Sequence, residues 1–243
     1  MKVAIVTGGS SGIGLAIAQK FYQKEIRTYS LDLNPPDDKH IAFIKCDMSK
    51  EEEVLAAIKK VEEEAGPVSY LVNNCGLQFM SPVDEFPTDK WKLLIDVMLT
   101  GTFLTTKAVL PLMKKNKFGR IINVSSVHGK LASPYKSAYV SAKHGVLGFT
   151  KVVAKEVGEF GITVNSICPG FVDTPLMRKQ IKSQMELNQL SEQEVLDQIF
   201  LKNQDIKKLT SPEQVADMCA FLISESAATI TGEAYNISGG WGA

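Results

Sequence analysis

Short apolar runs alternate with amphipathic segments along most of the chain. The runs at 3–6 and 68–72 are continuous and rich in apolar residues, as expected of strands that are buried on both faces. Similar runs predict the remaining strands at 27–31, 41–44, 119–124, 161–167 and 234–237. Amphipathic periodicity predicts helices at 15–21, 49–65, 90–115, 137–157 and 211–224. This alternation predicts an α/β fold with a parallel sheet covered by helices, formed by residues 1–243 as a single domain.

A glycine-rich turn connects the first predicted strand to the first predicted helix. It reads Thr7-Gly8-Gly9-Ser10-Ser11-Gly12-Ile13-Gly14. Glycines allow the backbone to approach a pyrophosphate, and the helix N-terminus supplies free N–H groups and a favourable dipole. A tight turn that binds nothing is the alternative, but the strand-to-helix context favours a dinucleotide-binding loop.

An acidic residue, Asp32, ends the second predicted strand, eighteen residues after Gly14. A carboxylate at this place can accept a hydrogen bond from the ribose 2′-OH of NAD and would repel the 2′-phosphate of NADP. Asp32 could also begin the turn that follows it, and the two roles are compatible. No basic residue near Ser10, Ser11 or Asp32 would receive a phosphate, so we expect NAD as the cofactor.

The segment from Ser125 to Lys143 contains the most reactive combination of side chains. Tyr139 and Lys143 are four residues apart in a predicted helix and therefore share one face. A free tyrosine has a pKa of about 10. A cation about 4 Å away at an effective dielectric of about 20 would lower that pKa by roughly 3 units. The pair therefore predicts a tyrosine that acts as a base near neutral pH.

Composition narrows the class of protein. The 27 basic and 27 acidic residues cancel, which argues against nucleic acid or an anionic membrane as partner. The four cysteines lie far apart without C-x-x-C spacing, so we expect reduced thiols and no metal site. We see neither a signal peptide nor an apolar run of about 20 residues, and we expect a cytoplasmic protein.

These motifs together resemble the classical short-chain dehydrogenase/reductase family over essentially the whole chain. The resemblance rests on the Thr7–Gly14 loop, Asn73-Asn74-Cys75-Gly76, Ser126, Tyr139-x-x-x-Lys143 and Pro169-Gly170. It implies a Rossmann-like doubly wound sheet of seven parallel strands, a nicotinamide cofactor and a homotetramer. It also implies Ser126, Tyr139 and Lys143 as catalytic residues. The predicted cofactor contacts are Gly8, Ser11, Gly12, Ile13, Gly14, Asp32, Asp47, Asn74, Gly76, Tyr139, Lys143, Pro169, Gly170 and Thr174.

Within this family the chain resembles the bacterial enzymes that oxidise D-3-hydroxybutyrate. The likeness rests on the segments 74–78, 126–129, 136–145, 167–170 and 174–181. It implies that a small carboxylate substrate is held by Gln78, Ser126, His128, Lys136, Tyr139, Phe171 and Gln180. Lys136 lies one turn before Tyr139 in the predicted helix, which suits a cation that receives an acid anion. Surface lysines and glutamines usually only contact solvent, which is the alternative for each residue.

Two positions depart from the resemblance. Phe171 stands where these enzymes have tryptophan, so the pocket for the alkyl end of the substrate is expected to differ in size. Met98 stands where the family has an asparagine whose main-chain carbonyl holds a water leading from the lysine to solvent. Methionine keeps that carbonyl, so we expect activity with an altered proton relay. The polar segment at about 175–208 is expected to be a mobile lid that selects the substrate.

The sequence therefore predicts reversible hydride transfer between NAD and a secondary alcohol, most simply 3-hydroxybutyrate with acetoacetate as product. Tyr139 would take the alcohol proton, Ser126 would hold the substrate oxygen, and Lys143 would support the tyrosine and bind the nicotinamide ribose. Another activity of the same family, on a 3-oxoacyl thioester, a sugar or a cyclic alcohol, is the main alternative. A non-catalytic nucleotide sensor is a second alternative, favoured only by Met98.

Overall fold

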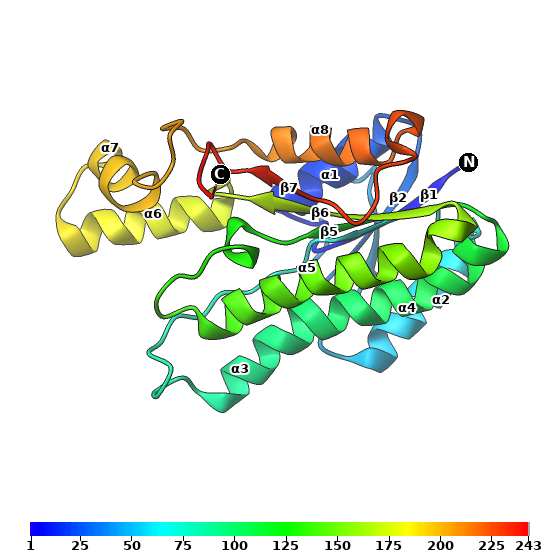
Figure 1. Cartoon of the computed structure of the whole chain (residues 1–243), viewed down its shortest axis with the longest axis horizontal. Helices are drawn as coiled ribbons and strands as arrows, with labels where there is room; N and C mark the ends of the chain where they lie inside the picture. The colour runs from blue at the N-terminus through cyan, green and yellow to red at the C-terminus, as the bar shows by residue number, and fades with distance from the viewer. Residues whose placement is uncertain (243) are drawn as a thin grey trace.

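The computed structural model describes residues 1–242, which form a seven-stranded sheet with helices on both faces (Figure 1). The strand order is β3-β2-β1-β4-β5-β6-β7, and every neighbouring pair is parallel. The order reverses direction between β1 and β4. Ligands of open α/β sheets bind beyond the carboxyl ends of the strands at such a reversal. The predicted Rossmann-like doubly wound fold is confirmed.

The strands lie where the apolar runs predicted them, with ends that differ by one or two residues. They are β1 (Val3–Thr7), β2 (Arg27–Asp32), β3 (Ala42–Lys45), β4 (Tyr70–Asn73), β5 (Gly119–Val124), β6 (Ile162–Pro169) and β7 (Ala234–Ile237). All residues of β1, β4, β5 and β6 are buried, as expected for central strands covered on both faces. Buried asparagine side chains are paired between strands: Asn73 donates to the Asn123 Oδ1 at 2.9 Å.

Two helices, α1 (Gly12–Tyr22) and α8 (Pro212–Leu222), cover one face of the sheet (Figure 1). The other face is covered by α2 (Glu51–Ala65), α4 (Gly101–Lys115) and α5 (Ser137–Val157). Short turns of 3-10 helix are η2 (Val127–Gly129), η3 (Gly158–Phe160) and η5 (Glu225–Ala227). Helix α8 begins with a reciprocal capping box formed by Ser211 and Gln214.

A long helical stretch, Thr88–Lys115, contains a turn that the sequence did not predict. It consists of α3 (Thr88–Ile95), a π-helical turn η1 (Asp96–Thr100) and α4. An 18-residue window of this stretch has a mean hydropathy of 1.5, so the stretch matches a membrane span by length and composition alone. Half of that window is buried in the protein, where the stretch packs against α2 and α5. The stretch is therefore a core element of one face of the sheet.

The segment predicted as a lid projects beyond the carboxyl ends of β5 and β6 (Figure 1). It contains α6 (Pro175–Asn188), α7 (Glu192–Val195) and a π-helical turn η4 (Leu196–Phe200). The rest of the segment, from residue 201 to residue 208, is irregular. Its small apolar core is formed by Met177, Ile181 and Val195. Where the segment begins and ends, the N–H of Thr210 donates to the Phe171 carbonyl, and the N–H of Asp173 donates to the Thr210 carbonyl.

Candidate active site

A cavity of about 530 Å³ lies at the carboxyl ends of the strands. Its walls come from the β1–α1 loop, the ends of β2, β4, β5 and β6, the segment before α2, helix α5 and the first turn of α6. Most of the residues predicted from the sequence line it. These are Gly8, Ser11, Gly12, Ile13, Asp32, Asp47, Asn74, Gly76, Gln78, Ser126, Tyr139, Lys143, Pro169, Gly170 and Thr174. Gly14, His128, Lys136, Phe171 and Gln180 are outside this lining.

The glycine-rich loop is fixed by backbone contacts. Gly8 and Gly12 have φ values of +63° and +51°, a left-handed conformation that favours glycine. Gly14 does not face the cavity: a Cβ there would clash with the Gly8 carbonyl oxygen and lie 2.6 Å from the Asn74 Nδ2. Gly14 therefore has a packing role that allows helix α1 to approach the loop, and its contact with the cofactor stays a prediction.

Asp32 occupies the end of β2, facing the same loop. Its carboxylate accepts N–H groups of Ser10 at 3.2 Å and Leu33 at 2.7 Å. Ser10 also shares a hydrogen bond of 2.8 Å with the Ser30 hydroxyl. The carboxylate therefore holds the turn after β2, as one prediction proposed, and also lines the cavity, as the other proposed.

The end of β4 is tied to the glycine loop. Asn74 Nδ2 donates to the carbonyls of Thr7 and Gly8, at 3.2 and 3.1 Å. The N–H groups of Asn74 and Cys75 both donate to the Thr7 hydroxyl. Asp47 accepts the N–H and hydroxyl of Ser49, and these hydrogen bonds lower the pKa of its carboxyl group. These hydrogen bonds fix the loops that follow β1, β3 and β4 at the cavity.

Ser126, Tyr139 and Lys143 meet on the opposite wall, where β5 ends and α5 begins. The Ser126 hydroxyl accepts the N–H of His128 at 3.1 Å, which opens the 3-10 turn η2. Neighbouring Ser125 donates to the Lys143 carbonyl at 2.9 Å and fastens α5 to this turn. Lys143 is only 4% exposed, yet its ammonium group lies at the cavity. The spacing of Tyr139 and Lys143 therefore places both on one helix face, as predicted.

The ammonium of Lys143 does not contact the phenol in the way the sequence suggested. Its Nζ donates to the Val124 carbonyl at 2.7 Å and lies 5.8 Å from the centroid of the Tyr139 ring. Burial lowers the pKa of Lys143 to about 8. Burial raises the pKa of Tyr139, and interaction with the Ser126 hydroxyl lowers it. In this arrangement the ammonium is directed at a backbone carbonyl, and burial is the largest influence on the pKa of Tyr139.

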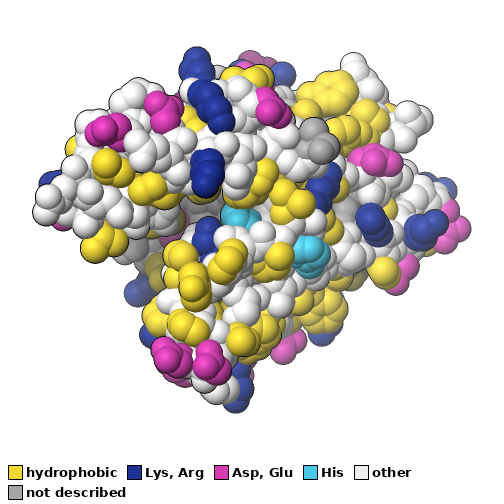
Figure 2. Space-filling model, turned by 60° about the vertical axis from the view of Figure 1, so that its left-hand side comes forward, with side chains coloured by type: hydrophobic (Ala, Val, Ile, Leu, Met, Phe, Trp, Pro, Cys, Tyr) yellow, Lys and Arg dark blue, Asp and Glu magenta, His cyan; other side chains and the backbone are white. Residues whose placement is uncertain are grey.

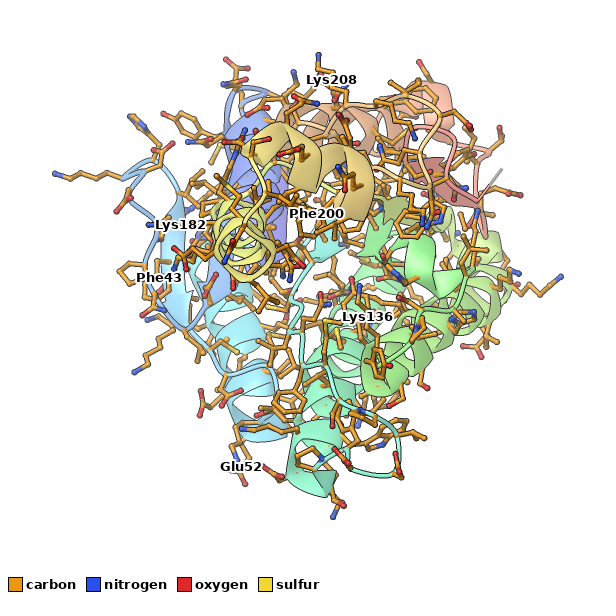
Figure 3. The ribbon with its side chains drawn as sticks, turned by 90° about the vertical axis from the view of Figure 1, so that its left-hand side faces the viewer. Phe43, Glu52, Lys136, Lys182, Phe200 and Lys208 are labelled. Atoms are coloured by element: carbon orange, nitrogen blue, oxygen red, sulfur yellow. The ribbon has the colours of Figure 1, made fainter. Side chains whose placement is uncertain are left out.

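Beside this wall, His128 and Lys136 form a second group of polar side chains. His128 is 5% exposed, and its Nε2 has no hydrogen-bond partner among residues 1–242. Burial and the charge of Lys136 lower the pKa of His128 to about 4, so its imidazole is neutral at pH 7. Burial also lowers the pKa of Lys136. Figure 2 shows a hollow in this face with histidine and lysine side chains beside it, and in Figure 3 Lys136 lies below the lid.

An aromatic wall adjoins His128, and one of its members was missed by the sequence analysis. The ring of Trp241 meets His128 edge to face at 5.1 Å and stacks on Phe171 at 5.4 Å. Phe171 in turn contacts Phe200 of the lid, which Figure 3 labels. Only the repeated glycines around Trp241, which mark a turn, could have suggested its position. The tryptophan ring stacked on Phe171 adds bulk beside the position where related enzymes have tryptophan.

Two predicted residues lie at the margins. Gln78 lines the cavity from the loop after β4, whereas Gln180 is a partly buried residue of α6 outside the lining.

Met98 is buried in the π-helical turn η1, and its carbonyl accepts the Thr102 hydroxyl at 2.7 Å. The carbonyl that the resemblance assigns to a water chain therefore already has a partner within the helix.

The residues of the cavity fit a nicotinamide dinucleotide. The free N–H end of α1, the close-packed glycine loop and the Asp32 carboxylate suit a pyrophosphate and a ribose. Pro169, Gly170 and Thr174 extend the cavity toward Tyr139, where the reacting end would lie. Thr174 also caps α6, since its hydroxyl accepts the N–H of Met177 at 3.2 Å.

Comparisons with known proteins agree with this geometry. D-beta-hydroxybutyrate dehydrogenase of Rhizobium meliloti is 42% identical, over 99% of this chain and 98% of that protein. Acetoacetyl-CoA reductase of Paracoccus denitrificans is 36% identical, over 98% of this chain and 97% of that protein. Both relatives match over their whole length, so the resemblance is not confined to the glycine loop.

Solved structures show the same fold. Aldohexose dehydrogenase of Thermoplasma acidophilum superposes with a TM-score of 0.92 at 32% identity, covering 99% of this chain and 93% of that one. A variant of actinorhodin polyketide ketoreductase with NADPH gives 0.90 at 33% identity, covering 99% and 97%. 4-Hydroxyisoleucine dehydrogenase complexed with NADH gives 0.85 at 30% identity, covering 100% and 99%.

A family model described as short chain dehydrogenase matches residues 2–185, which include the glycine loop, Ser126, Tyr139 and Lys143. Members of this family are oxidoreductases that use nicotinamide cofactors and act on small molecules. Together with the parallel sheet and the cavity at its reversal point, this match identifies the chain as a member of the short-chain dehydrogenase family.

Proposed function

We propose that the protein is an NAD-dependent dehydrogenase of a small 3-hydroxy acid, with 3-hydroxybutyrate as substrate and acetoacetate as product. The observation that carries this proposal is the pair formed by His128 and Lys136 beside Tyr139. A buried imidazole nitrogen without a partner and a partly buried ammonium form a site that favours a carboxylate. The 42% identity to a D-beta-hydroxybutyrate dehydrogenase supports the same substrate class.

In the proposed mechanism, each residue of the catalytic wall has one task. Tyr139 as phenolate accepts the alcohol proton, and the Ser126 hydroxyl donates a hydrogen bond to the substrate oxygen. Lys143, held by the Val124 carbonyl, supplies a positive charge behind the phenol that favours the phenolate. The bound nicotinamide supplies the hydride acceptor, and its positive charge in the oxidised form favours the same ionisation.

The substrate anion would be oriented by groups on both sides of the hollow. Lys136 supplies the charge, His128 a neutral ring nitrogen, and Gln78 and Gln180 supply amides from the β4 loop and the lid. Phe171, stacked on Trp241, would enclose the methyl end. Neutral imidazole avoids a second buried cation, so one positive charge balances one carboxylate.

NAD is proposed as the cofactor because of Asp32. Its carboxylate is held by the N–H groups of Ser10 and Leu33 at the place where a 2′-phosphate would have to lie. A phosphate there would meet a fixed negative charge.

The lid at about 175–208 would close over the bound substrate and exclude water. We also retain the proposals of a homotetramer and a cytoplasmic location, which size-exclusion chromatography with light scattering and cell fractionation would test.

The decisive experiment mixes the protein with NAD and racemic 3-hydroxybutyrate and follows absorbance of the reduced cofactor. Lys136→Ala should raise the KM for 3-hydroxybutyrate at least tenfold, because the substrate carboxylate loses its charged partner. A tenfold increase corresponds to a loss of about 1.4 kcal/mol. The KM for NAD should stay within about twofold. Lys151→Ala, at an exposed lysine of helix α5, is the matched control and should change neither constant. Equal KM values for wild type and Lys136→Ala would contradict the carboxylate site.

Reduction of a 3-oxoacyl thioester is the second candidate, because an acetoacetyl-CoA reductase is 36% identical over nearly the whole chain. A thioester carries no carboxylate at that position and would leave Lys136 unpaired. Activity on acetoacetyl-CoA that is insensitive to Lys136→Ala, without activity on acetoacetate, would favour this candidate. Absence of turnover with either substrate, combined with tight NAD binding, would favour a nucleotide sensor.

A further inference from the structure

Four residues other than glycine have a left-handed backbone among the described residues: Glu25, Lys117, Tyr135 and Gln189. Three of them end a helix. In each case the next N–H reaches back five residues to a helix carbonyl: Ile26 to Phe21, Phe118 to Met113, and Leu190 to Met185. This is the usual way in which a left-handed residue satisfies the last carbonyls of a helix, so these three need no other explanation.

Tyr135 is different, because it precedes a helix instead of following one. It has a φ of +65° and lies two residues before the first residue of α5. Its ring is 58% exposed, so burial of the side chain does not account for the backbone conformation. Strained backbone of this kind persists where the surrounding structure fixes it and is concentrated at functional sites.

The surroundings fix the two peptide groups on either side of Lys136. The carbonyl of Tyr135 accepts the N–H of Ser81 at 3.0 Å, from the loop that also carries Gln78. The carbonyl of Lys136 accepts the N–H of Val140 at 2.9 Å, which is the first turn of α5. Lys136 itself has a φ of −119° and a ψ of 33°, outside the helical range. The left-handed turn at Tyr135 therefore decides the direction in which the Lys136 side chain leaves the backbone.

We propose that Tyr135 is a positioning residue whose left-handed backbone directs the Lys136 ammonium toward His128 and the substrate carboxylate. The inference deepens the proposed function and rests on it. The phenol of Tyr135 takes no part, so any side chain that tolerates a left-handed backbone can replace it. A β-branched side chain, which resists that conformation, turns Lys136 away from the hollow.

The test compares three substitutions at this position. Tyr135→Val should raise the KM for 3-hydroxybutyrate at least fivefold while kcat and the KM for NAD change less than twofold. Tyr135→Asn, which removes the ring but favours a left-handed backbone, should keep the KM within twofold of wild type. Tyr135→Phe, which removes only the hydroxyl, should do the same. Equal increases in Tyr135→Asn and Tyr135→Val would overturn the proposal, because the ring and not the backbone would then matter.

A matched control separates positioning from general loss of stability. Lys117→Val places the same strain at the left-handed residue after α4, far from Lys136 in the chain. It should lower the melting temperature about as much as Tyr135→Val and leave the KM for 3-hydroxybutyrate unchanged. An equal KM increase in Lys117→Val would show that the effect is only loss of stability and would overturn the proposal.

A second readout does not depend on the substrate. Acetylation of Lys136 by acetic anhydride, measured by peptide mass spectrometry, reports the exposure of its amine. Tyr135→Val should change this rate severalfold, whereas Tyr135→Asn and Tyr135→Phe should match wild type. If wild type does not oxidise 3-hydroxybutyrate, the proposed function fails, and the acetylation rates alone decide the role of Tyr135. Identical rates in all four proteins would overturn it.

Discussion

The proposed cofactor side and the proposed substrate side of the cavity are built in different ways. The cofactor side consists of the ends of β1, β2 and β4, joined by backbone and amide hydrogen bonds around the glycine loop. The substrate side consists of segments from distant parts of the chain: the β4 loop, the start of α5, the lid and the C-terminal turn that carries Trp241. Fewer predicted residues of this side line the cavity, and aromatic contacts replace the backbone network.

The difference shows how one fold can keep one chemistry and vary its substrate. Residues that hold the loop also hold the sheet, so a change there alters stability as well as binding. Residues of the substrate side contact one another and can change with less effect on the sheet. The following experiments test this division, starting with the residue that both sides share.

Tyr139→Phe should give the largest effect. Loss of the general base is expected to lower kcat by roughly 10²–10⁴, whereas the Kd of NAD should stay within about threefold, because the ring remains in place. Stopped-flow turnover and fluorescence titration of NADH measure the two quantities. A residual rate above about a tenth of wild type would remove Tyr139 from the catalytic wall.

Gly14→Ala tests whether the cofactor side depends on close packing. The added methyl group would clash with the Gly8 carbonyl oxygen, and we expect a loss of about 3 kcal/mol in the free energy of unfolding. Gly148→Ala is the matched control, since a methyl group there meets no atom within 4 Å on α5. That change should stabilise the protein by up to about 1 kcal/mol. Urea unfolding compares them, and equal stabilities would contradict the packing role of Gly14.

Asp32→Ser tests the charge on the cofactor side. The substitution removes the hydrogen bonds between the Asp32 carboxylate and the NAD ribose, and hydrogen bonds to a charged group are worth about 1.5–3 kcal/mol. We therefore expect a roughly tenfold to hundredfold higher Kd for NAD. Binding of NADP should weaken less or improve, so the preference between the two falls. Asp38→Ser is the control, because that carboxylate accepts from Gln19 and the His40 backbone outside the cavity. An unchanged NAD preference in Asp32→Ser would exclude Asp32 as the discriminating residue.

His128→Gln tests the substrate side through pH. Burial lowers the pKa of His128 from 6.5 to about 4, so the unfolded chain binds the proton more readily between these values. Stability from His128 is therefore present above pH 6.5 and is lost as the pH falls toward 4, by about 1–2 kcal/mol between pH 7 and pH 5. Unfolding at both pH values measures this loss, which His128→Gln should reduce. An identical pH dependence in the variant would mean that His128 is not buried in its neutral form.

Local patterns in the sequence predicted the fold and most of the cofactor side. Each strand, turn and helix there is determined by residues that are neighbours in the sequence. Because the strands are parallel, their carboxyl ends all lie at the same edge of the sheet. The segment 119–124 and the pair Tyr139 and Lys143 were placed correctly for this reason. The Rossmann-like doubly wound fold with seven parallel strands followed from the family resemblance and was confirmed.

The remainder depends on contacts between distant residues. The Lys143 ammonium donates a hydrogen bond to the carbonyl of Val124, which lies 19 residues earlier in the chain. No spacing rule in the sequence predicts this partner. Trp241 reaches His128 only because β7 pairs with β6 and the chain then turns back. The π-helical turn at Asp96–Thr100 inserts one residue into a stretch that looks like a continuous helix. The close packing of Gly14 against the Gly8 carbonyl was not predicted, because the glycine motif does not distinguish packing from binding.

The two ends of the lid lie side by side, and this arrangement bears on how its length can vary. Phe171 and Thr210 are hydrogen-bonded to each other, so the chain leaves the sheet and returns to it at a single point. A loop closed at its base can be lengthened at a cost of only about 0.6 kcal/mol for each doubling. Changes of length in this segment should therefore leave the sheet beneath it largely undisturbed.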